Sequence, residues 1–374
     1  MSNCTPKTNC LDQVKQILSD EFIRETSFQL WEAHLEWLHK LGFKDALRQE
    51  VQGVCSAASF GHEVVDLLSQ FVCSTGYVNA HLGLTSSDII DNVRLMQVDA
   101  AITRLDQKAS EVAHCLRQLD SLTKTVGFTH WQPAAPICWS QRVDAWFAPI
   151  SLIRGNLPII HAKQFGGPVG DSASLEIVLG DWPEYQNFDW MPFGLEQPEN
   201  RTPLQSSDYL DETAAINWCC ALAAQLHKIA QDLRFLASQG LVRIITGVAG
   251  SSSMPHKVNP YKWEKVCSIC RSVSSTQSEI WSVMAQNSLE RTLDGSWQIK
   301  ALLRRCFEGL ALALDEFCAV RMTNNVQLDT EMLIRLHDQL STDEVLTRRV
   351  VEGGESRWAA YLDMLNHKSS EKSS

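Results

Sequence analysis

The sequence predicts an all-α fold with a long central bundle of helices. Apolar residues recur at steps of three and four over two long stretches, 95–119 and 222–236. Such stripes are typical of helices that pack side by side. Segments that alternate between apolar and polar residues are scarce, and no β-α-β order is visible. The stripes consist of Leu95, Val98, Ile102, Leu105, Ala109, Val112, Leu116 and Leu119, and of Leu222, Leu226, Ile229, Leu233 and Leu236.

In chain order, the helical pattern is interrupted by loops, because clustered Gly and Pro cannot sustain a helix. The interruptions are a connection at 76–87, a loop at 166–170, an irregular crossing at 181–203, a loop at 247–260 and a polar tail after 366. We expect three parts: an N-terminal helical domain over 1–90, a central bundle over 91–318 and a shortened C-terminal helical domain over 319–374.

Composition excludes several classes of partner. The 374 residues include 33 Lys and Arg against 44 Asp and Glu, so the net charge is −11. An acidic chain lacks the dense basic face that nucleic acids require. No apolar run approaches the roughly 18–20 residues of a membrane span, and the polar start differs from a secretory signal. We expect a cytoplasmic protein without nucleic-acid or membrane partners.

The twelve cysteines are irregularly spaced. One pair, Cys267 and Cys270, has the spacing of zinc ligands, but no second pair completes a site. We therefore expect reduced, structural thiols, with no metal ion and no cofactor.

Polar residues gather in three of the loops, and the first is 81–88. Thr85, Ser86, Ser87 or Asp88 could cap the N-terminus of the helix that follows. The same hydroxyls and the free N–H groups of a helix start could instead bind a carboxylate. The sequence leaves both interpretations open.

The second loop, 127–136, contains His130 between Thr129 and Gln132. A single histidine is commonly structural, but so many hydrogen-bonding groups in one turn favour proton transfer.

The third loop, 250–260, has the sequence Gly-Ser-Ser-Ser-Met-Pro-His-Lys-Val-Asn-Pro. It could be a flexible linker. Alternatively, a Gly/Ser stretch that ends in Lys257 and Asn259 could close over an anion.

These motifs resemble the fumarase/aspartase superfamily over about 28–361. Residues 250–260 match its signature, and HLGLTSSDIIDN (81–92) and GFTHWQPA (127–134) match its other two regions in order. The chain is most similar to the adenylosuccinate lyase branch, shortened at both ends. His256 before the lysine and the segment ERTLDGS (290–296) favour this branch.

The resemblance implies a cofactor-free β-elimination that releases fumarate from adenylosuccinate to give AMP. By the same resemblance, the enzyme would also release fumarate from the succinylated aminoimidazole carboxamide ribotide of purine synthesis. It also implies a homotetramer in which His62, His130 and Ser251 of one active site come from different chains. The two apolar stripes would then lie at the seam between subunits, or else form the core of a single chain.

The resemblance also assigns roles to individual residues. Ser251 would be the base and His130 the acid, with Glu264 holding His130 in place. His62 would be a second histidine at the site, and Lys257 would bind the carboxylate on which negative charge accumulates. These five are the implied catalytic residues. The implied substrate-binding residues are His81, Thr85, Ser86, Thr129, Gln205, Met254 and Asn259, with Lys265, Arg291, Ser296 and Lys300 at the phosphate.

Charge supports an anionic small-molecule substrate, since 251–305 holds eight Lys and Arg against four Asp and Glu. The alternative is an ordinary solvated helix face. Three departures affect the nucleotide end of the site: no Arg-Tyr pair precedes Phe28, Gly61 and Glu63 flank His62, and Lys300 replaces an arginine. A lyase for another N-succinyl or aspartate-derived amine, and a catalytically silent structural or regulatory relative, are the alternatives.

Overall fold

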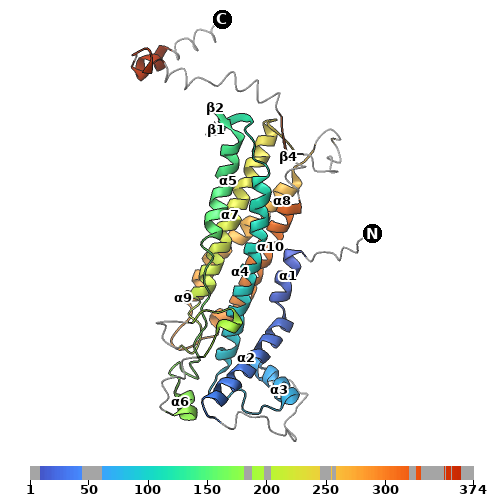
Figure 1. Cartoon of the computed structure of the whole chain (residues 1–374), viewed down its shortest axis with the longest axis vertical. Coiled ribbons are helices and arrows are strands. Elements are labelled where there is room, and N and C mark those ends of the chain that lie inside the picture. The colour runs from blue at the N-terminus through green and yellow to red at the C-terminus, as the bar shows by residue number, and fades with distance from the viewer. Residues whose placement is uncertain are drawn as a thin grey trace. The chain divides into compact units, whose positions relative to one another are not determined.

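The structure, a computed structural model, describes residues 9–43, 61–180, 188–197, 204–244, 254, 258–319, 326–329, 349, 351–354 and 356–363. Long helices dominate this part of the chain (Figure 1), which confirms the predicted helical fold class. The helices are α1 (Cys10–Ile17), α2 (Asp20–Lys40), α3 (Glu63–Thr75), α4 (Ser86–Arg117), α5 (Trp139–Arg154), α6 (Ala173–Leu179), α7 (Leu210–Ser238), α8 (Tyr261–Ser274), α9 (Thr276–Ala285) and α10 (Asp294–Ala319), with the 3₁₀ turn η3 (Met191–Phe193). The strands are β1 (Lys124–Thr129), β2 (Gln132–Cys138), β3 (Val242–Ile244) and β4 (Val326–Leu328).

The chain divides into two compact units. Unit 1 comprises Met1–Glu111, Leu152–His227 and Lys265–Phe317, and unit 2 comprises Val112–Ser151, Lys228–Glu264 and Cys318–Ser374. Each unit is assembled from three separated segments. The three consecutive domains expected from the sequence stay a prediction.

In unit 1, helices α4, α7, α8 and α10 pack against one another (Figure 1). Lys108 on α4 lies 3.6 Å from Asp315 on α10. The thiol of Cys220 on α7 donates to the carbonyl of Val273 on α8 at 3.4 Å. The sequence therefore folds these distant segments into one helical bundle.

Unit 2 contains an antiparallel hairpin of β1 and β2, with Thr129 opposite Gln132. The side chains of Phe128 and Trp131 pack edge-on against Phe235 on α7, at 5.0 and 4.6 Å between ring centroids. The sequence predicts only a turn here. Pro133 and Pro136 argue against a strand at the level of sequence, because proline is accepted only in edge strands. Both strands of a two-stranded hairpin are edge strands, so β2 tolerates them.

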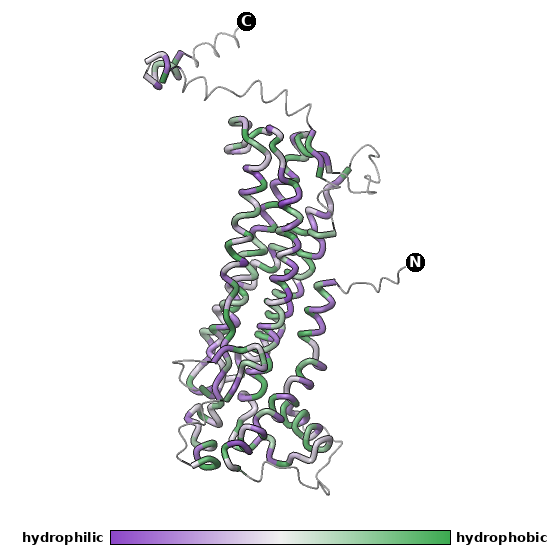
Figure 2. The backbone as a smooth tube through the Cα atoms, in the orientation of Figure 1, coloured by the Kyte–Doolittle hydropathy of each residue, from purple (hydrophilic) through white to green (hydrophobic). Residues whose placement is uncertain are grey.

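Both apolar stripes are buried. No residue of either stripe exceeds 9% exposure, and Figure 2 shows apolar and polar residues interleaved along the long helices. Side chains that are already covered within one chain cannot contact another subunit. The stripes are therefore the core of the single chain, and their placement at a subunit seam is wrong.

Nine of the described cysteines are free thiols, as expected. Cys73 is disulfide-bonded, so the expectation of reduced thiols is wrong at this position. Among the described residues, no helix has the length and apolar character that crossing a membrane requires.

A buried ion cluster joins α4 to α7 in unit 1. The guanidinium of Arg94 donates to Asp91 and to Glu212, each at 2.8 Å, and lies 5.2 Å from the ring centroid of Tyr209. The side chains of Arg94 and Glu212 are 11% and 0% exposed. Charges removed from water in this way are tolerated because they are paired.

Replacing Arg94 by leucine is expected to lower the free energy of unfolding by roughly 3–5 kcal/mol, since two carboxylates lose their buried partner. Urea denaturation measures the change. Arg305→Ala is the control, because its pair with Glu279 is about half exposed and such pairs contribute less than about 1 kcal/mol. Equal losses in the two variants would contradict the prediction.

Candidate active site

The N-terminus of α4 is capped by a carboxylate. The backbone N–H of Thr85 donates to Asp88 Oδ2 at 2.8 Å, one turn into the helix. This is the reciprocal half of a capping box. The hydroxyls of Thr85 and Ser86 take part in no hydrogen bond within the described residues. Asp88 therefore caps the helix, and the hydroxyls of Thr85 and Ser86 remain available to a ligand.

The Asp88 carboxylate is fully buried and accepts three further hydrogen bonds. Its donors are Lys163 Nζ at 2.5 Å, Gly166 N at 2.9 Å and Gly167 N at 3.1 Å. A buried charge is costly unless it is paired and hydrogen-bonded. Asp88 meets both conditions by drawing the 163–167 segment against the start of α4.

The glycines of 166–170 permit a close approach to the 204–205 segment. A Cβ at Gly166 would lie 2.4 Å from the carbonyl oxygen of Leu204, and one at Gly170 would lie 2.8 Å from the backbone N of Gln205. The Ser87 hydroxyl donates to the carbonyl of Gln205 from the other side. Thr85, Ser86 and Gln205, three predicted substrate-binding residues, are thereby brought to the same end of unit 1.

Gln205 is 9% exposed, and its side-chain oxygen is buried without a hydrogen-bond partner among the described residues. A buried amide oxygen without a donor costs free energy. A ligand that carries an N–H or O–H group would satisfy this oxygen.

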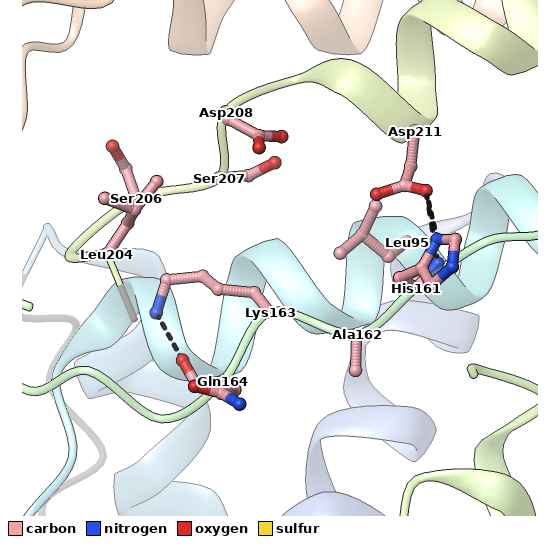
Figure 3. Close-up of a pocket in the computed structure, with 10 residues that line it drawn as sticks. All are labelled: Leu95, His161, Ala162, Lys163, Gln164, Leu204, Ser206, Ser207, Asp208 and Asp211. Carbon is pink, nitrogen blue, oxygen red and sulfur yellow. Dashed lines mark hydrogen bonds and ion pairs between the residues drawn. The ribbon is translucent and has the colours of Figure 1, made fainter. Parts of the chain in front are cut away.

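A small pocket lies beside this segment (Figure 3). It is lined by 161–164 on one side and by 204–211 on the other, and the ring nitrogen Nδ1 of His161 lies 2.9 Å from Asp211 Oδ1. Its volume of about 30 Å³ accommodates roughly two water molecules.

The start of α3 brings two predicted site residues, His62 and Lys300, close to a third, His81. His62 caps α3 by accepting from the backbone N of Val65 at 3.5 Å. Lys300 Nζ pairs with Glu63 at 2.6 Å. The pKa of His81 is lowered, chiefly by burial. The charge of Asp88 acts to raise this pKa, and His62 acts to lower it. His62, His81 and Lys300 therefore belong to one region of unit 1.

The other predicted phosphate contacts differ in their environments. The Ser296 hydroxyl hydrogen-bonds to the side chain of Tyr209, whose pKa is raised by burial. Lys265 pairs with Glu316 at 2.7 Å. Arg291 is half-buried and forms no ion pair within the described residues.

His130 stands at the exposed tip of the hairpin in unit 2, next to Thr129 at the end of β1. His130 and Trp131 have φ angles of 49° and 63°, as a two-residue type I′ turn requires. Backbone strain of this kind often marks functional positions. His130 makes no hydrogen bond to the part of the chain that the structure describes, so its ring is free to meet a partner or substrate.

The signature loop is only partly described. Met254 is 42% exposed and Asn259 is half-buried, while Ser251 and Lys257 lie outside the described residues. Glu264 pairs with Arg234 at 3.4 Å. Its expected contact with His130 stays a prediction.

Three residues that organise this region are not predicted by the sequence: Lys163, Trp31 and His34. Each acts on a segment far away in the chain, so no local pattern could have revealed it. Within the described residues, no cluster of three or more His, Cys, Asp and Glu side chains could hold a metal ion.

Comparisons with known proteins agree with the motifs. A family model described as Lyase matches residues 49–275. The chain is 30% identical to adenylosuccinate lyase from Schizosaccharomyces pombe over 240 residues, which are 61% of this chain and 50% of the yeast enzyme. It is 26% identical to adenylosuccinate lyase from Schistosoma mansoni, with 91% of this chain and 77% of that enzyme covered. The chain thus spans only half the length of the Schizosaccharomyces pombe relative.

Among solved structures, the fold is similar to 3-carboxy-cis,cis-muconate lactonizing enzyme from Pseudomonas putida. The TM-score is 0.71 at 21% identity, and the match covers 94% of this chain and 84% of that chain. A fumarate lyase from Mesorhizobium sp. BNC1 matches with a TM-score of 0.66 at 16% identity, covering 96% and 92%. These structures support the fold.

Replacing Asp88 by asparagine is expected to lower the free energy of unfolding by roughly 3–5 kcal/mol, because Lys163 would keep its charge in a buried site without a counter-ion. Asp99→Asn on the same helix is the matched control. Burial raises the pKa of Asp99 to about 6, so its ionised form is disfavoured in the folded state.

Because this pKa is raised, the penalty from Asp99 is present above about pH 6 and disappears as the pH falls through the unfolded value near 4. Asp99→Asn should therefore stabilise the protein at pH 7 and have no effect at pH 4. Denaturation curves at both pH values check this. A stability loss at pH 7 in the control would contradict the assignment.

Proposed function

Since the chain belongs to the lyase family of the fumarase/aspartase superfamily, we propose that it is a carbon–nitrogen lyase that releases fumarate from an N-succinyl substrate, adenylosuccinate first among them. The observation that carries this proposal is the start of α4, where a buried carboxylate performs the capping and leaves two hydroxyls and free N–H groups for an anion. Small succinylated nucleotides, including the carboxamide ribotide of purine synthesis, are the substrate class.

Binding of a succinyl carboxylate at this helix start has a clear physical basis. The helix α4 is 32 residues long, and the aligned peptide dipoles place partial positive charge at its N-terminus. Thr85 and Ser86 would add hydroxyl donors. Gln205, with its unsatisfied oxygen, would accept from the substrate.

The elimination needs a base, an anion clamp and an acid. Ser251 would remove a proton from the carbon next to one succinyl carboxylate. The freed electron pair would form the C=C bond of fumarate as the C–N bond breaks, and His130 would protonate the departing nitrogen. Lys257 and Asn259 would hold the carboxylate on which negative charge accumulates.

Serine is too weak a base without activation, so its pKa must fall in the closed loop. Neighbouring cations such as Lys257 and the N–H groups of the Gly/Ser stretch would stabilise the alkoxide. We further propose a cytoplasmic homotetramer in which His62, His130 and Ser251 of one site come from different chains.

Ser251→Ala is expected to lower kcat for fumarate release from adenylosuccinate by a factor of about 10² to 10⁴, the range for a lost general base. Fumarate is followed by its absorbance and by chromatography. Ser238→Ala, whose hydroxyl donates to the carbonyl of Phe235 and accepts from the side-chain amide of Gln239, is the control and should match the parent. A parent that turns over no N-succinyl compound would overturn the proposal and favour a silent relative.

A second candidate is a lyase for an N-succinyl or aspartate-derived amine that carries no phosphate. The favouring observation is the ion pair of Lys300 with Glu63. A lysine already paired with a carboxylate attracts a phosphate less strongly, and a phosphate would have to compete with Glu63.

Glu63→Gln separates these candidates. Releasing Lys300 should lower KM for adenylosuccinate severalfold, with kcat unchanged, if the lysine receives the phosphate. Substrates without phosphate should show no change. Glu308→Gln serves as the control for loss of one carboxylate from the same unit. An unchanged KM for adenylosuccinate would contradict a phosphate role for Lys300.

A further inference from the structure

Helix α2 holds the segment that carries His81 at two points. The indole Nε1–H of Trp31 donates to Nδ1 of His81 at 3.2 Å. One turn later, Nδ1 of His34 bonds the carbonyl oxygen of Ala80 at 3.2 Å. Trp31 and His34 are three residues apart, so they share one face of α2, and both are fully buried.

The hydrogen bond of His34 defines its protonation. A carbonyl oxygen only accepts, so the proton lies on Nδ1 and Nε2 carries a lone pair. That Nε2 is buried without a partner among the described residues. Burial lowers the pKa of His34 to about 3, so the ring stays neutral. His34 is a support for the backbone at Ala80.

The hydrogen bond of Trp31 defines the tautomer of His81. An indole N–H only donates, so Nδ1 of His81 must present a lone pair and the single proton must lie on Nε2. The two rings meet edge-on, with 6.1 Å between centroids and 74° between planes. Protonation of Nδ1 would break this bond and place two N–H groups face to face.

The position of Trp31 is itself constrained. Its ring lies 5.4 Å from Phe71 on α3 and 6.3 Å from Phe28 on α2. The titratable groups that face His81 are Asp88 at the start of α4, His62 at the start of α3 and the neutral His34 on α2. Asp88 already accepts four hydrogen bonds, so it is poorly placed to take a further one from His81.

We infer that Trp31 is a positioning residue that holds His81 as the neutral Nε2–H tautomer, so that His81 donates a hydrogen bond to a carboxylate bound at the start of α4. The backbone supports this location, since the N–H of Leu84 donates to the carbonyl of His81 at 3.2 Å and Thr85 follows directly. The inference deepens the proposed function and rests on it for the identity of the carboxylate.

A fixed neutral donor has a chemical advantage over an imidazolium. It binds the carboxylate through one directed hydrogen bond, and burial, which lowers the pKa of His81, favours the neutral ring. It also has no proton to release into the site during the reaction. Proton delivery therefore remains with His130, and the two histidines have separate tasks.

Trp31→Phe in the full-length protein tests this assignment, because it keeps an aromatic ring and removes the N–H donor. Fumarate is the probe, and calorimetry gives its Kd between pH 6 and 8.5. At pH 8 the variant should bind fumarate about two- to tenfold more weakly, the factor for one hydrogen bond. The KM for adenylosuccinate should rise equally, with a smaller change in kcat.

The pH dependence separates positioning from simple packing. Without the indole, His81 can take a second proton as the pH falls, and an imidazolium always carries the Nε2–H donor. The defect in Kd should therefore shrink towards pH 6. A defect of the same size at pH 6 and pH 8, or no defect at all, would overturn the inference.

Trp37→Phe is the matched control. Trp37 lies on the same helix, is 8% exposed, and packs against His34, Phe165 and Phe188, and its indole makes no hydrogen bond to the described residues. This variant should show no pH-dependent change in Kd. In a His81→Gln background, Trp31→Phe should likewise add none, because glutamine donates at every pH.

Should Trp31→Phe fail to fold, site-specific replacement of Trp31 by 3-benzothienylalanine carries the test, since sulfur replaces the N–H in a ring of the same shape. A parent that binds fumarate but cleaves no N-succinyl compound would overturn the proposed function and leave the Kd test intact. A parent that does not bind fumarate would overturn the inference.

Discussion

The buried carboxylate of Asp88 is the interaction on which the candidate site depends. It lies at 0% exposure and receives donors from Thr85, Lys163, Gly166 and Gly167. Removing a carboxylate from water costs several kcal/mol, and only a full set of donors with a cation offsets this cost. The chain can supply those donors in one way, by folding 163–167 onto the start of α4. One charge therefore determines where the glycine loop lies and relieves the nearby hydroxyls of capping.

The first turns of α4 hold two loops in the same way, those at Lys163 and at Ser207. Asp91 accepts from the backbone N of Ser207 at 2.9 Å, and Asn92 both donates to the carbonyl of Lys163 and accepts from its N–H. Asp88 and Asp91 lie three residues apart, so they share a face of the helix. In the motif at 81–92, the buried residues Asp88, Asp91 and Asn92 bind loops, whereas Thr85 and Ser86 do not. The motif at 81–92 thus has a structural half and a half that we propose binds the substrate.

The sequence could predict the features that repeat or that are local. The stripes at 95–119 and 222–236 gave the long helices, because helical periodicity depends only on neighbours one turn away. The sequence does not predict the hairpin, because Pro133 and Pro136 are residues that strands usually exclude, yet both lie in β2. It could not predict Lys163 or Trp31, whose partners lie 75 and 50 residues away. Whether the stripes form a core or a seam also depends on tertiary packing that periodicity does not encode. The roles of Ser251 and Lys257 rest on the resemblance.

Charge shows why a count along the chain misjudges a site. The segment 251–305 has four more cations than anions, yet three of its seven described cations pair with carboxylates. Lys265 pairs with Glu316, Lys300 with Glu63 and Arg305 with Glu279. The other four, Lys262, Arg271, Arg291 and Arg304, form no ion pair within the described residues. The potential at a site follows from such three-dimensional pairing. At the start of α4, we propose that an anion is recognised mainly by uncharged donors: the helix N-terminus, two hydroxyls and the neutral ring of His81. Uncharged donors bind through direction rather than through net charge. They favour a carboxylate of defined geometry over anions in general.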